Sequence, residues 1–310
     1  MHGSRERINI PAGQSFRVLR WSKHVGEVEC ILKPNRVERV SGEGAHWHYH
    51  NEMELTLFHA GEGTRFVGDH IGRFSKGELV LLGEKLPHYW HATGTSSGIS
   101  LQWSFPHGHA LWALPETLAL QDFFEKAGRG IRYIGSAAHE AGTFMQEISE
   151  MSGSARLGRL LQLFAMLAAA PESGRNFLAG RAFSRPSKFT HQNAVKKVVS
   201  HLIANFRNEI RLSDVLEVAG MSKPTFSRQF KAHAGKSFSE FVSHLRLQAA
   251  CRDLAETDRS ILDIALANGF SQVSFFNRLF RRLLKCSPSQ YREQRRHLID
   301  RTESREQRRK

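Results

Sequence analysis

The chain has 310 residues, of which 40% are apolar, and its formal net charge is +14. A chain of this length and composition is expected to fold as two domains rather than one. Its three cysteines, Cys30, Cys251 and Cys286, lie far apart in the sequence, which excludes a disulfide framework and a thiolate zinc site and fits a reducing compartment.

The positive charge is concentrated in the C-terminal part of the chain. Residues 191–310 hold 23 basic and 12 acidic residues, a net +11, whereas residues 1–190 hold 21 and 18, a net +3. This asymmetry suggests a polyanionic partner, with a solvated surface as the alternative. Because no signal segment is present and the longest apolar run, residues 160–170, is too short to cross a bilayer, we expect a cytoplasmic protein with no membrane partner.

The first third of the chain, residues 16–105, has the pattern of short strands separated by glycines. The segment Val67–Ile71 contains Gly68 and Asp69 between apolar runs, which predicts a tight hairpin. Many short strands at close spacing predict a β-sandwich or barrel. The clearest strand candidates are residues 27–34, 53–60, 64–74, 77–83 and 98–105.

Histidines and glutamates crowd into residues 46–54. If this segment is extended, His46, His48 and His50 share one face. Such a cluster favours a hydrogen-bonding pocket for a hydroxylated or anionic small molecule; a bound metal and histidines with no ligand are the alternatives. We expect the aromatic residues nearby to be core residues rather than sugar-stacking platforms: Trp47, Tyr49, Trp90 and Trp103.

Two motifs in this region resemble those of the cupin superfamily. The first has its spacing in Gly42, His48, His50, Glu54 and Gly61, and the second has Gly77 and His88 in register. The second motif departs from the family at Gly83, Lys85 and Ala92. The resemblance implies a small barrel, the double-stranded β-helix. It also implies four ligands for iron, manganese, nickel or zinc: His48, His50, Glu54 and His88.

Helical periodicity replaces the strand pattern from residue 115 to residue 170. An apolar stripe runs along its second half, and it either packs on the barrel or forms a dimer seam. The stripe consists of Leu157, Leu160, Leu161, Phe164 and Leu167. Residues 171–192 have the composition of a linker, and an amphipathic helix follows from Val195.

The basic part of the chain contains an internal duplication. Residues 225–241 and 275–291 match at an offset of 50, whereas Gly220 and Gly269 match at an offset of 49, so the second turn is one residue longer. Each copy reads as a helix, a glycine at the helix end, and a second helix with Ser222 or Ser271 as its N-cap. This is the pattern of a helix-turn-helix.

The second helix of each copy has an apolar side and a polar side. Phe226 and Phe230, like Phe276 and Phe280, lie four residues apart and are expected to face inward. The opposite sides suit a major groove, where Arg binds guanine, Asn binds adenine, and Lys or Arg neutralises phosphate; a solvated helix face is the alternative. The candidate DNA-binding residues are Ser222, Lys223, Pro224, Ser227, Arg228, Lys231, Ser271, Gln272, Ser274, Asn277, Arg278 and Arg281.

Residues 238–256, between the two copies, predict one helix of 19 residues. At about 1.5 Å per residue this helix is roughly 28 Å long. It could hold the two reading helices about one DNA turn, roughly 34 Å, apart.

The segment 263–292 resembles the C-terminal signature of the AraC/XylS transcription regulators, with a Gly-Phe turn, paired aromatics, a basic helix and Ser-Pro before Tyr-Arg. The resemblance covers residues 193–296 and implies a seven-helix domain. It carries base contacts onto Ser227, Arg228, Ser274, Asn277 and Arg278. Leu216 stands where the family commonly has a small residue, whereas Ala265 fills that position in the second copy.

The expected architecture is a two-domain α+β protein with an N-terminal cupin-like β-barrel and a C-terminal all-α double helix-turn-helix. Its expected parts are a sensor at 1–110, a helical dimerisation segment at 111–170, a linker at 171–192, a DNA-binding domain at 193–296 and a disordered basic tail at 297–310.

The expected function is a homodimeric regulator that binds double-stranded DNA, senses a small molecule such as a sugar or related metabolite, and contacts RNA polymerase if it activates. It is expected to be no enzyme and to require no cofactor, with a divalent metal as an option. In cupins joined to such DNA-binding domains the polar cluster is usually the effector site, here His46, His48, His50, Glu54 and His88. The alternatives are a metal-dependent cupin enzyme tethered to DNA and an architectural DNA-binding protein.

Overall fold

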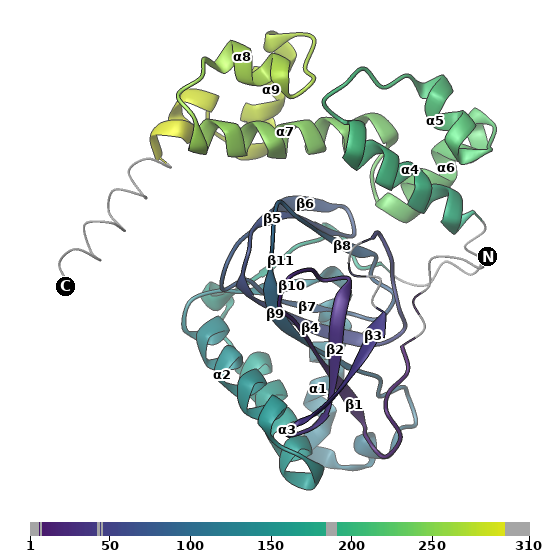
Figure 1. Ribbon diagram of the computed structural model, residues 1–310, viewed down its shortest axis with the longest axis vertical. Coiled ribbons are helices and arrows are strands. Elements are labelled where there is room, and N and C mark those ends of the chain that lie inside the picture. The colour runs from purple at the N-terminus through teal and green to yellow at the C-terminus, as the bar shows by residue number, and fades with distance from the viewer. Residues whose placement is uncertain (1–5, 7, 42–43, 45, 184–190, 295–310) are drawn as a thin grey trace, which may run out of the picture. The chain divides into compact units, whose positions relative to one another are not determined.

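The computed structural model describes residues 6, 8–41, 44, 46–183 and 191–294. The chain divides into two compact units (Figure 1). The first comprises the chain up to Lys196 together with His233–Gly235, and the second comprises Lys197–Ala232 and the chain from Lys236 onward. Within the described residues, no helix has the length and apolar character needed to span a membrane.

Two antiparallel sheets form the first unit. The larger has eight strands in the order β11-β10-β7-β4-β9-β1-β2-β3, and the smaller has the order β6-β5-β8. No strand pairing among the described residues joins the two sheets into one closed barrel. The strands are β1 (Phe16–Trp21), β2 (Glu27–Lys33), β3 (Arg36–Ser41), β4 (Met53–Ala60), β5 (Gly63–Val67), β6 (His70–Phe74), β7 (Leu79–Leu82), β8 (His88–Ala92), β9 (Ser97–Trp103), β10 (Ile131–Tyr133) and β11 (Arg175–Phe177).

The predicted β-rich N-terminal region is confirmed, and each predicted strand segment contains at least one strand. The predicted hairpin is also present, because β5 pairs with β6 through Val67 and His70, and Gly68 takes a positive φ of 56° in the turn. Strands β10 and β11 were not predicted. Each has only three residues, too few to show the period of two. The first part of the predicted linker therefore contains the 3-10 helix Glu172–Gly174 and strand β11, whereas its residues 184–190 and the predicted tail lie outside the described residues.

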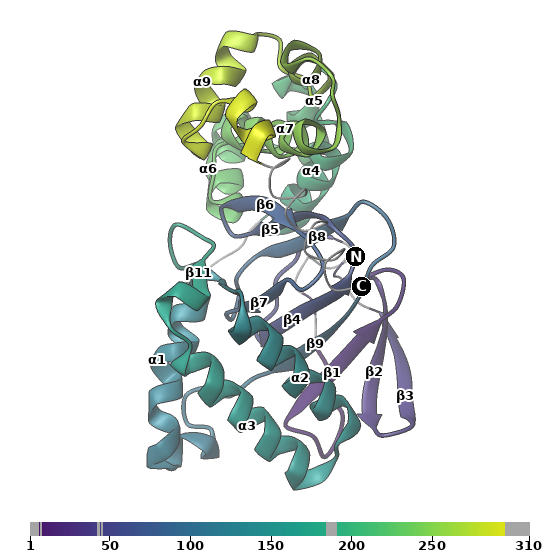
Figure 2. The same ribbon diagram turned by 90° about the vertical axis from the view of Figure 1, so that its left-hand side faces the viewer.

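Strict alternation along the central strands divides the large sheet into two faces. On β4, Leu55 and Leu57 belong to the main core, whereas Glu54 and Thr56 are buried on the opposite side. Three helices cover the apolar face (Figure 2). They are α1 (Leu118–Lys126), α2 (Ser136–Glu150) and α3 (Gly153–Ala169), accompanied by short 3-10 helices at Ala110–Ala113, Pro115–Thr117, Ala127–Arg129 and Glu172–Gly174.

The apolar stripe of α3 packs against this sheet. Leu160, Phe164 and Leu167 are fully buried in the main core, and Leu157 and Leu161 pack against it partly buried. Of the two interpretations of the stripe, packing on the sheet is therefore the one observed.

Arg156 on α3 ties this helix layer to the first hairpin. It is 4% exposed, and its guanidinium donates to the carbonyl oxygens of Ile31 (2.8 Å), Leu32 (3.2 Å) and Ile148 (3.2 Å). A buried guanidinium is stable when its donors are used in this way.

Helices alone form the second unit. They are α4 (Gln192–Asn205), α5 (Leu212–Ala219), α6 (Lys223–Ala234), α7 (Phe238–Glu256), α8 (Ile261–Ala267) and α9 (Val273–Leu284). A further helix begins at Pro288, so the described residues contain the seven helices that the resemblance implies. The central helix α7 has the predicted bounds, and Ser237 and Glu240 form a capping box at its start.

We predict that Arg156→Leu lowers the free energy of unfolding of the first unit by about 2–4 kcal/mol, because the carbonyl oxygens of Ile31, Leu32 and Ile148 each lose a hydrogen bond from the buried guanidinium. Denaturant unfolding followed by tryptophan fluorescence measures this unit, since all five tryptophans lie in it. The control is Arg159→Leu, three residues along the same helix. The half-exposed Arg159 pairs with Glu147, so its loss should cost less than about 1 kcal/mol. Equal losses in the two variants would contradict this role for Arg156.

Candidate nucleic-acid interface and candidate metal centre

The first helix-turn-helix consists of α5, a tight turn and α6. Gly220 ends α5 in the left-handed conformation, with φ of 60°, and its N–H donates to Glu217. Helix α6 begins at Lys223, so Ser222 precedes it as predicted.

The second helix-turn-helix repeats this geometry with one residue more. Gly269 has a φ of 82°, and the N–H of Phe270 donates to Ala265, as the N–H of Met221 donates to Leu216 in the first copy. The prediction of Ser271 as N-cap is wrong, because α9 begins at Val273 and Gln272 occupies the cap. The additional residue of this turn moves the serine out of the cap position.

The predicted inward faces are confirmed. Phe226 and Phe230 of α6 are at most 1% exposed, and Phe276 and Phe280 of α9 are fully buried. In α6 the ring of Phe230 packs edge-on against Phe241 of α7 at 5.4 Å, which fixes the rotation of the reading helix.

The predicted outward faces are on the surface. Of the twelve candidate residues, Asn277 is half-buried and the other eleven are exposed. The cationic members form no ion pair with any residue of the described part. Their charges are therefore available to phosphate or to base edges. These cations are Lys223, Arg228, Lys231, Arg278 and Arg281.

Leu216, which stands where the AraC/XylS family commonly has a small residue, differs from its equivalent in burial. Leu216 is half-buried, whereas Ala265, its equivalent in the second copy, is fully buried. The longer side chain remains at the edge of the first helix-turn-helix instead of entering it.

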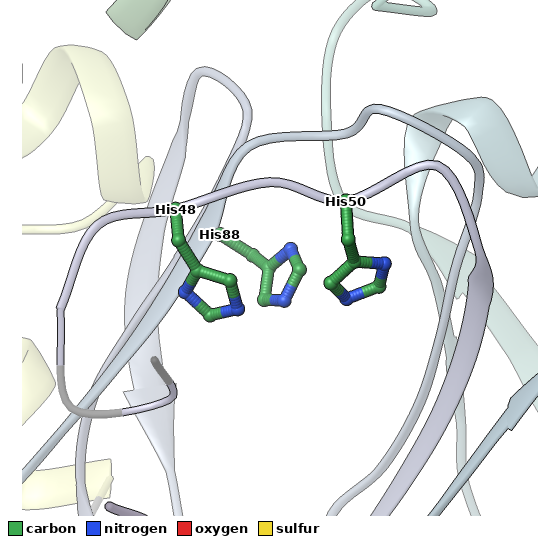
Figure 3. Close-up of side chains that lie close together, drawn as sticks. All are labelled: His48, His50 and His88. Atoms are coloured by element: carbon green, nitrogen blue, oxygen red, sulfur yellow. The ribbon is translucent and has the colours of Figure 1, made fainter. Parts of the chain in front are cut away.

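Three buried histidines meet between the sheets (Figure 3). His48 and His88 face each other across an isolated bridge, and His50 follows two residues after His48. One ring nitrogen from each histidine lies within 4.8 Å of the other two. Glu54 Oε2 lies 3.1 Å from His50 Nε2 and 3.9 Å from His88 Nε2.

The backbone fixes the tautomer of each ring. The Nδ1 atoms of His48, His50 and His88 lie 2.8–2.9 Å from carbonyl oxygens two residues away, and a carbonyl oxygen can only accept. Each Nδ1 therefore carries a proton, and in the neutral ring the lone pair is on Nε2. His88 Nε2 is buried without a hydrogen-bond partner among the described residues.

Burial and the neighbouring charges set the protonation of the cluster. Burial lowers the pKa of His88 to about 4 and also lowers the pKa of His48. Burial alone would raise the pKa of Glu54, but the hydrogen bond with His50 and the nearby histidines hold it well below its usual range. At neutral pH the cluster therefore presents lone pairs from two neutral imidazoles beside a carboxylate.

The cavity that reaches this cluster is small, and His48 and Glu54 are the members of the cluster that line it. The cavity has a volume of about 40 Å³, and its polar lining includes Glu6, His48, Glu54 and Gln102. Ligand pockets are typically about 300–1,000 Å³, so the cavity fits an ion or water but not a sugar. Among the polar side chains of the lining, Gln102 donates to Glu54 at 2.6 Å and Thr56 donates to Ser100 at 3.0 Å.

Sequence reasoning placed some of these residues and missed others. His48, His50, Glu54 and His88 come together as predicted, but His46 is exposed and lies outside the cluster, because residues 46–47 form a bend instead of a strand. Gly42 of the first motif lies outside the described residues. Trp47, Trp90 and Trp103 are buried, in agreement with the expected core role.

Two partners of the cluster were missed. The alternation of β9 points Gln102 to the same side as Ser100, a signal that could have been used. Glu6 lies 3.4 Å from His48 Nε2 and from Arg17, and nothing in the local sequence indicates it.

Comparisons with known proteins cover mainly the second unit. A family model described as a helix-turn-helix domain matches residues 215–294. An HTH-type transcriptional regulator of Staphylococcus aureus is 32% identical over 112 residues, which are 36% of this chain and 15% of the regulator. The regulatory protein PocR of Salmonella typhimurium is 35% identical over 104 residues, 34% of each protein. The match thus spans about a seventh to a third of the length of these relatives.

Solved structures are similar to the chain as well. The DNA-binding domain of the transcriptional factor AdpA, solved with a target DNA, is 27% identical, covers 34% of this chain and 94% of its own, and gives a TM-score of 0.33. ToxT from Vibrio cholerae is 13% identical, covers 90% of this chain and 98% of its own, and also gives 0.33. The prediction of a helix-turn-helix domain in the second unit is confirmed by the family match and by the helices.

The two turns should respond differently to the same substitution. Gly220→Ala places a β-carbon in open space and should cost about 1 kcal/mol for the left-handed backbone alone. Gly269→Ala should cost clearly more, because its β-carbon would lie 2.8 Å from the carbonyl oxygen of Arg207 and 2.9 Å from that of Phe206. Thermal unfolding followed by circular dichroism at a helical wavelength measures both. A larger loss for Gly220→Ala would contradict the described turn geometry.

Proposed function

We propose that this chain, whose residues 215–294 form a helix-turn-helix domain of the AraC type, is a sequence-specific DNA-binding transcription regulator. One observation carries the proposal. Each of the two helix-turn-helix copies buries an equivalent pair of phenylalanines and exposes a similar polar and cationic face. A merely solvated surface gives no reason for this repetition.

In this proposal α6 and α9 enter neighbouring major grooves of one duplex. Helix α7 has 19 residues, about 28 Å, which suits two reading helices roughly one DNA turn apart. Arg228 and Arg278 are exposed and have no ion pair among the described residues, so they can bind guanine with two hydrogen bonds, and Asn277 can bind adenine. Lys231 and Arg281 follow one turn later and are assigned to phosphate.

Base contacts and phosphate contacts can be separated by mutation. Arg278→Ala should weaken specific binding by about 1–3 kcal/mol and relax the preference at one base pair, because a base contact is lost. Lys231→Ala should weaken binding to all sequences alike and reduce the salt slope by about one. Fluorescence anisotropy with the operator, its single-base variants and a salt series distinguishes the two effects. Equal losses on all sequences for Arg278→Ala would contradict base readout at this position.

We further propose that the histidine cluster holds a divalent metal. The ligands would be the Nε2 atoms of His48, His50 and His88 with the carboxylate of Glu54. Nitrogen and oxygen donors of this kind suit iron, manganese, nickel or zinc. The bonds from each Nδ1 to a carbonyl oxygen orient the rings as in metal sites, and the unpartnered His88 Nε2 supports the assignment. Bound there, the metal would supply a positive charge to the carboxylate and stabilise the fold. The cavity of about 40 Å³ leaves no room for an organic substrate, which supports this role over that of a tethered enzyme.

Metal binding can be tested by comparing variants of a histidine inside the cluster and a histidine outside it. The purified protein should bind one ion, measured by elemental analysis, and gain thermal stability with it. His88→Ala should weaken binding at least about tenfold, because a ligand is lost. His46→Ala is the matched control and should bind like the wild type, because His46 is exposed. Failure of the wild type to bind any of the four metals would reject the site.

The regulatory part of the proposal concerns a small-molecule effector, a homodimer and contact with RNA polymerase if the protein activates. Support for the sensor role comes from two cavities of the first unit, about 840 and 460 Å³ in volume, whose linings contain no member of the histidine cluster. An effector that binds one conformation better than another would shift the DNA-binding population accordingly. Homodimerisation remains a prediction, with no seam assigned to α3.

A further inference from the structure

An aromatic cavity of the first unit lies apart from the histidine cluster. Its volume is about 460 Å³, within the range of roughly 300–1,000 Å³ for small-molecule sites. Residues just after β9, the 3-10 helix Ala110–Ala113 and α1 supply most of its wall. The residues that decide its chemistry are Glu84, Phe105, Trp112, Phe124 and Glu125.

Three aromatic rings form a corner in this wall. The rings of Phe105 and Trp112 meet at 86° with centroids 6.4 Å apart, and those of Trp112 and Phe124 meet at 73° with centroids 5.9 Å apart. The corner is held in place. Trp112 Nε1 donates to the carbonyl oxygen of Phe105 at 3.0 Å, and Phe124 packs edge-on against Phe164 at 5.1 Å. The three rings are therefore held in position before any ligand arrives.

The charge of this wall is opposite to that of the protein. Glu84 and Glu125 are exposed members of the lining, and no lysine or arginine lines the cavity among the described residues, although the chain carries a net +14. Glu84 forms a long ion pair with Lys85, whose Nζ lies 4.0 Å from its carboxylate. Glu125 forms no ion pair or side-chain hydrogen bond within the described part, and its neighbour Lys126 is bound to Asp122 at 2.6 Å.

One aromatic ring of the lining already packs against a cationic side chain of the protein. The guanidinium of Arg181 lies 5.0 Å from the ring centre of Phe183. Phe105, Trp112 and Phe124 have no such partner in the described residues.

We propose that this cavity binds an organic cation, a quaternary ammonium or a protonated amine with an apolar body. The negative ring faces attract such a cation, most strongly at tryptophan, and the two carboxylates add a Coulomb attraction. An anion would be repelled by the same groups, and the other polar side chains of the lining, His107 and Gln121, leave the wall without a lysine or arginine among the described residues. The larger cavity of 840 Å³ carries Lys76 and Arg132 together with Glu78 and Glu147, so it selects no single charge.

The proposal deepens the proposed function, because it assigns the chemical class of the effector. Binding of a cation does not itself require DNA. The two can therefore be tested separately.

Isothermal titration of the full-length protein with choline and with benzyltrimethylammonium tests the site. Both should bind saturably, and 3,3-dimethylbutan-1-ol, the uncharged isostere of choline, should bind at least about tenfold more weakly than choline because it lacks the cation–π term. Absence of saturable binding by both cations, or equal affinity for the isostere, would overturn the proposal.

Four variants assign the binding to this wall. Trp112→Leu should reduce affinity for benzyltrimethylammonium at least about tenfold, whereas Trp112→Phe keeps an aromatic face and should retain most of it. Glu125→Gln should reduce affinity several-fold, and Glu140→Gln, an exposed glutamate on α2 outside the lining, is the matched control. If Trp112→Leu does not fold, the Trp112→Phe and Glu125→Gln results decide. Wild-type affinity in Glu125→Gln together with wild-type affinity in a folded Trp112→Leu would also reject the site.

A footprint on operator DNA with the same protein separates the two proposals. Saturable cation binding without any footprint would reject the regulator and keep the cavity. A footprint without cation binding would keep the regulator and reject the cation site.

Discussion

The alternation of side chains along the central strands is the constraint on which the first unit depends. One face of β4 and β9 buries Leu55, Leu57 and Leu101 under the helices, and the other buries Glu54 and Gln102. A buried polar group is costly unless it is hydrogen-bonded, so the second face must supply partners to each of its members. The polar cluster between the sheets is the result, and the same requirement fixes the imidazole rings through backbone carbonyl groups.

The second unit relies on a different period. Phenylalanines four residues apart lock each reading helix onto its own small core, and the remaining sides of α6 and α9 are then free of packing demands. Recognition residues can change there without loss of fold. A rigid apolar seam and an adaptable polar surface thus lie on one helix.

Sequence alone predicted most of what is periodic or duplicated. The predicted bounds of α7 were correct, and the capping box of Ser237 and Glu240 is the physical reason that the helix begins there. It failed where the decisive partners are distant. His46 was assigned to the cluster by an alternation that the bend at residues 46–47 interrupts, and Glu6 reaches His48 across more than forty residues. The volumes of the cavities could not be predicted from the sequence either, because they depend on how helices and strands pack against one another.

The additional residue in the second turn has a consequence for the nucleic acid. The two reading helices follow turns of unequal length and present different side chains, with Pro224 and Ser227 in one and Ser274 and Asn277 in the other. In the proposed complex, two unequal reading helices would make contact with the duplex asymmetrically, so one bound chain would distinguish the upstream from the downstream direction. The proposed regulator would then set its orientation at a promoter within a single polypeptide, without a palindromic site.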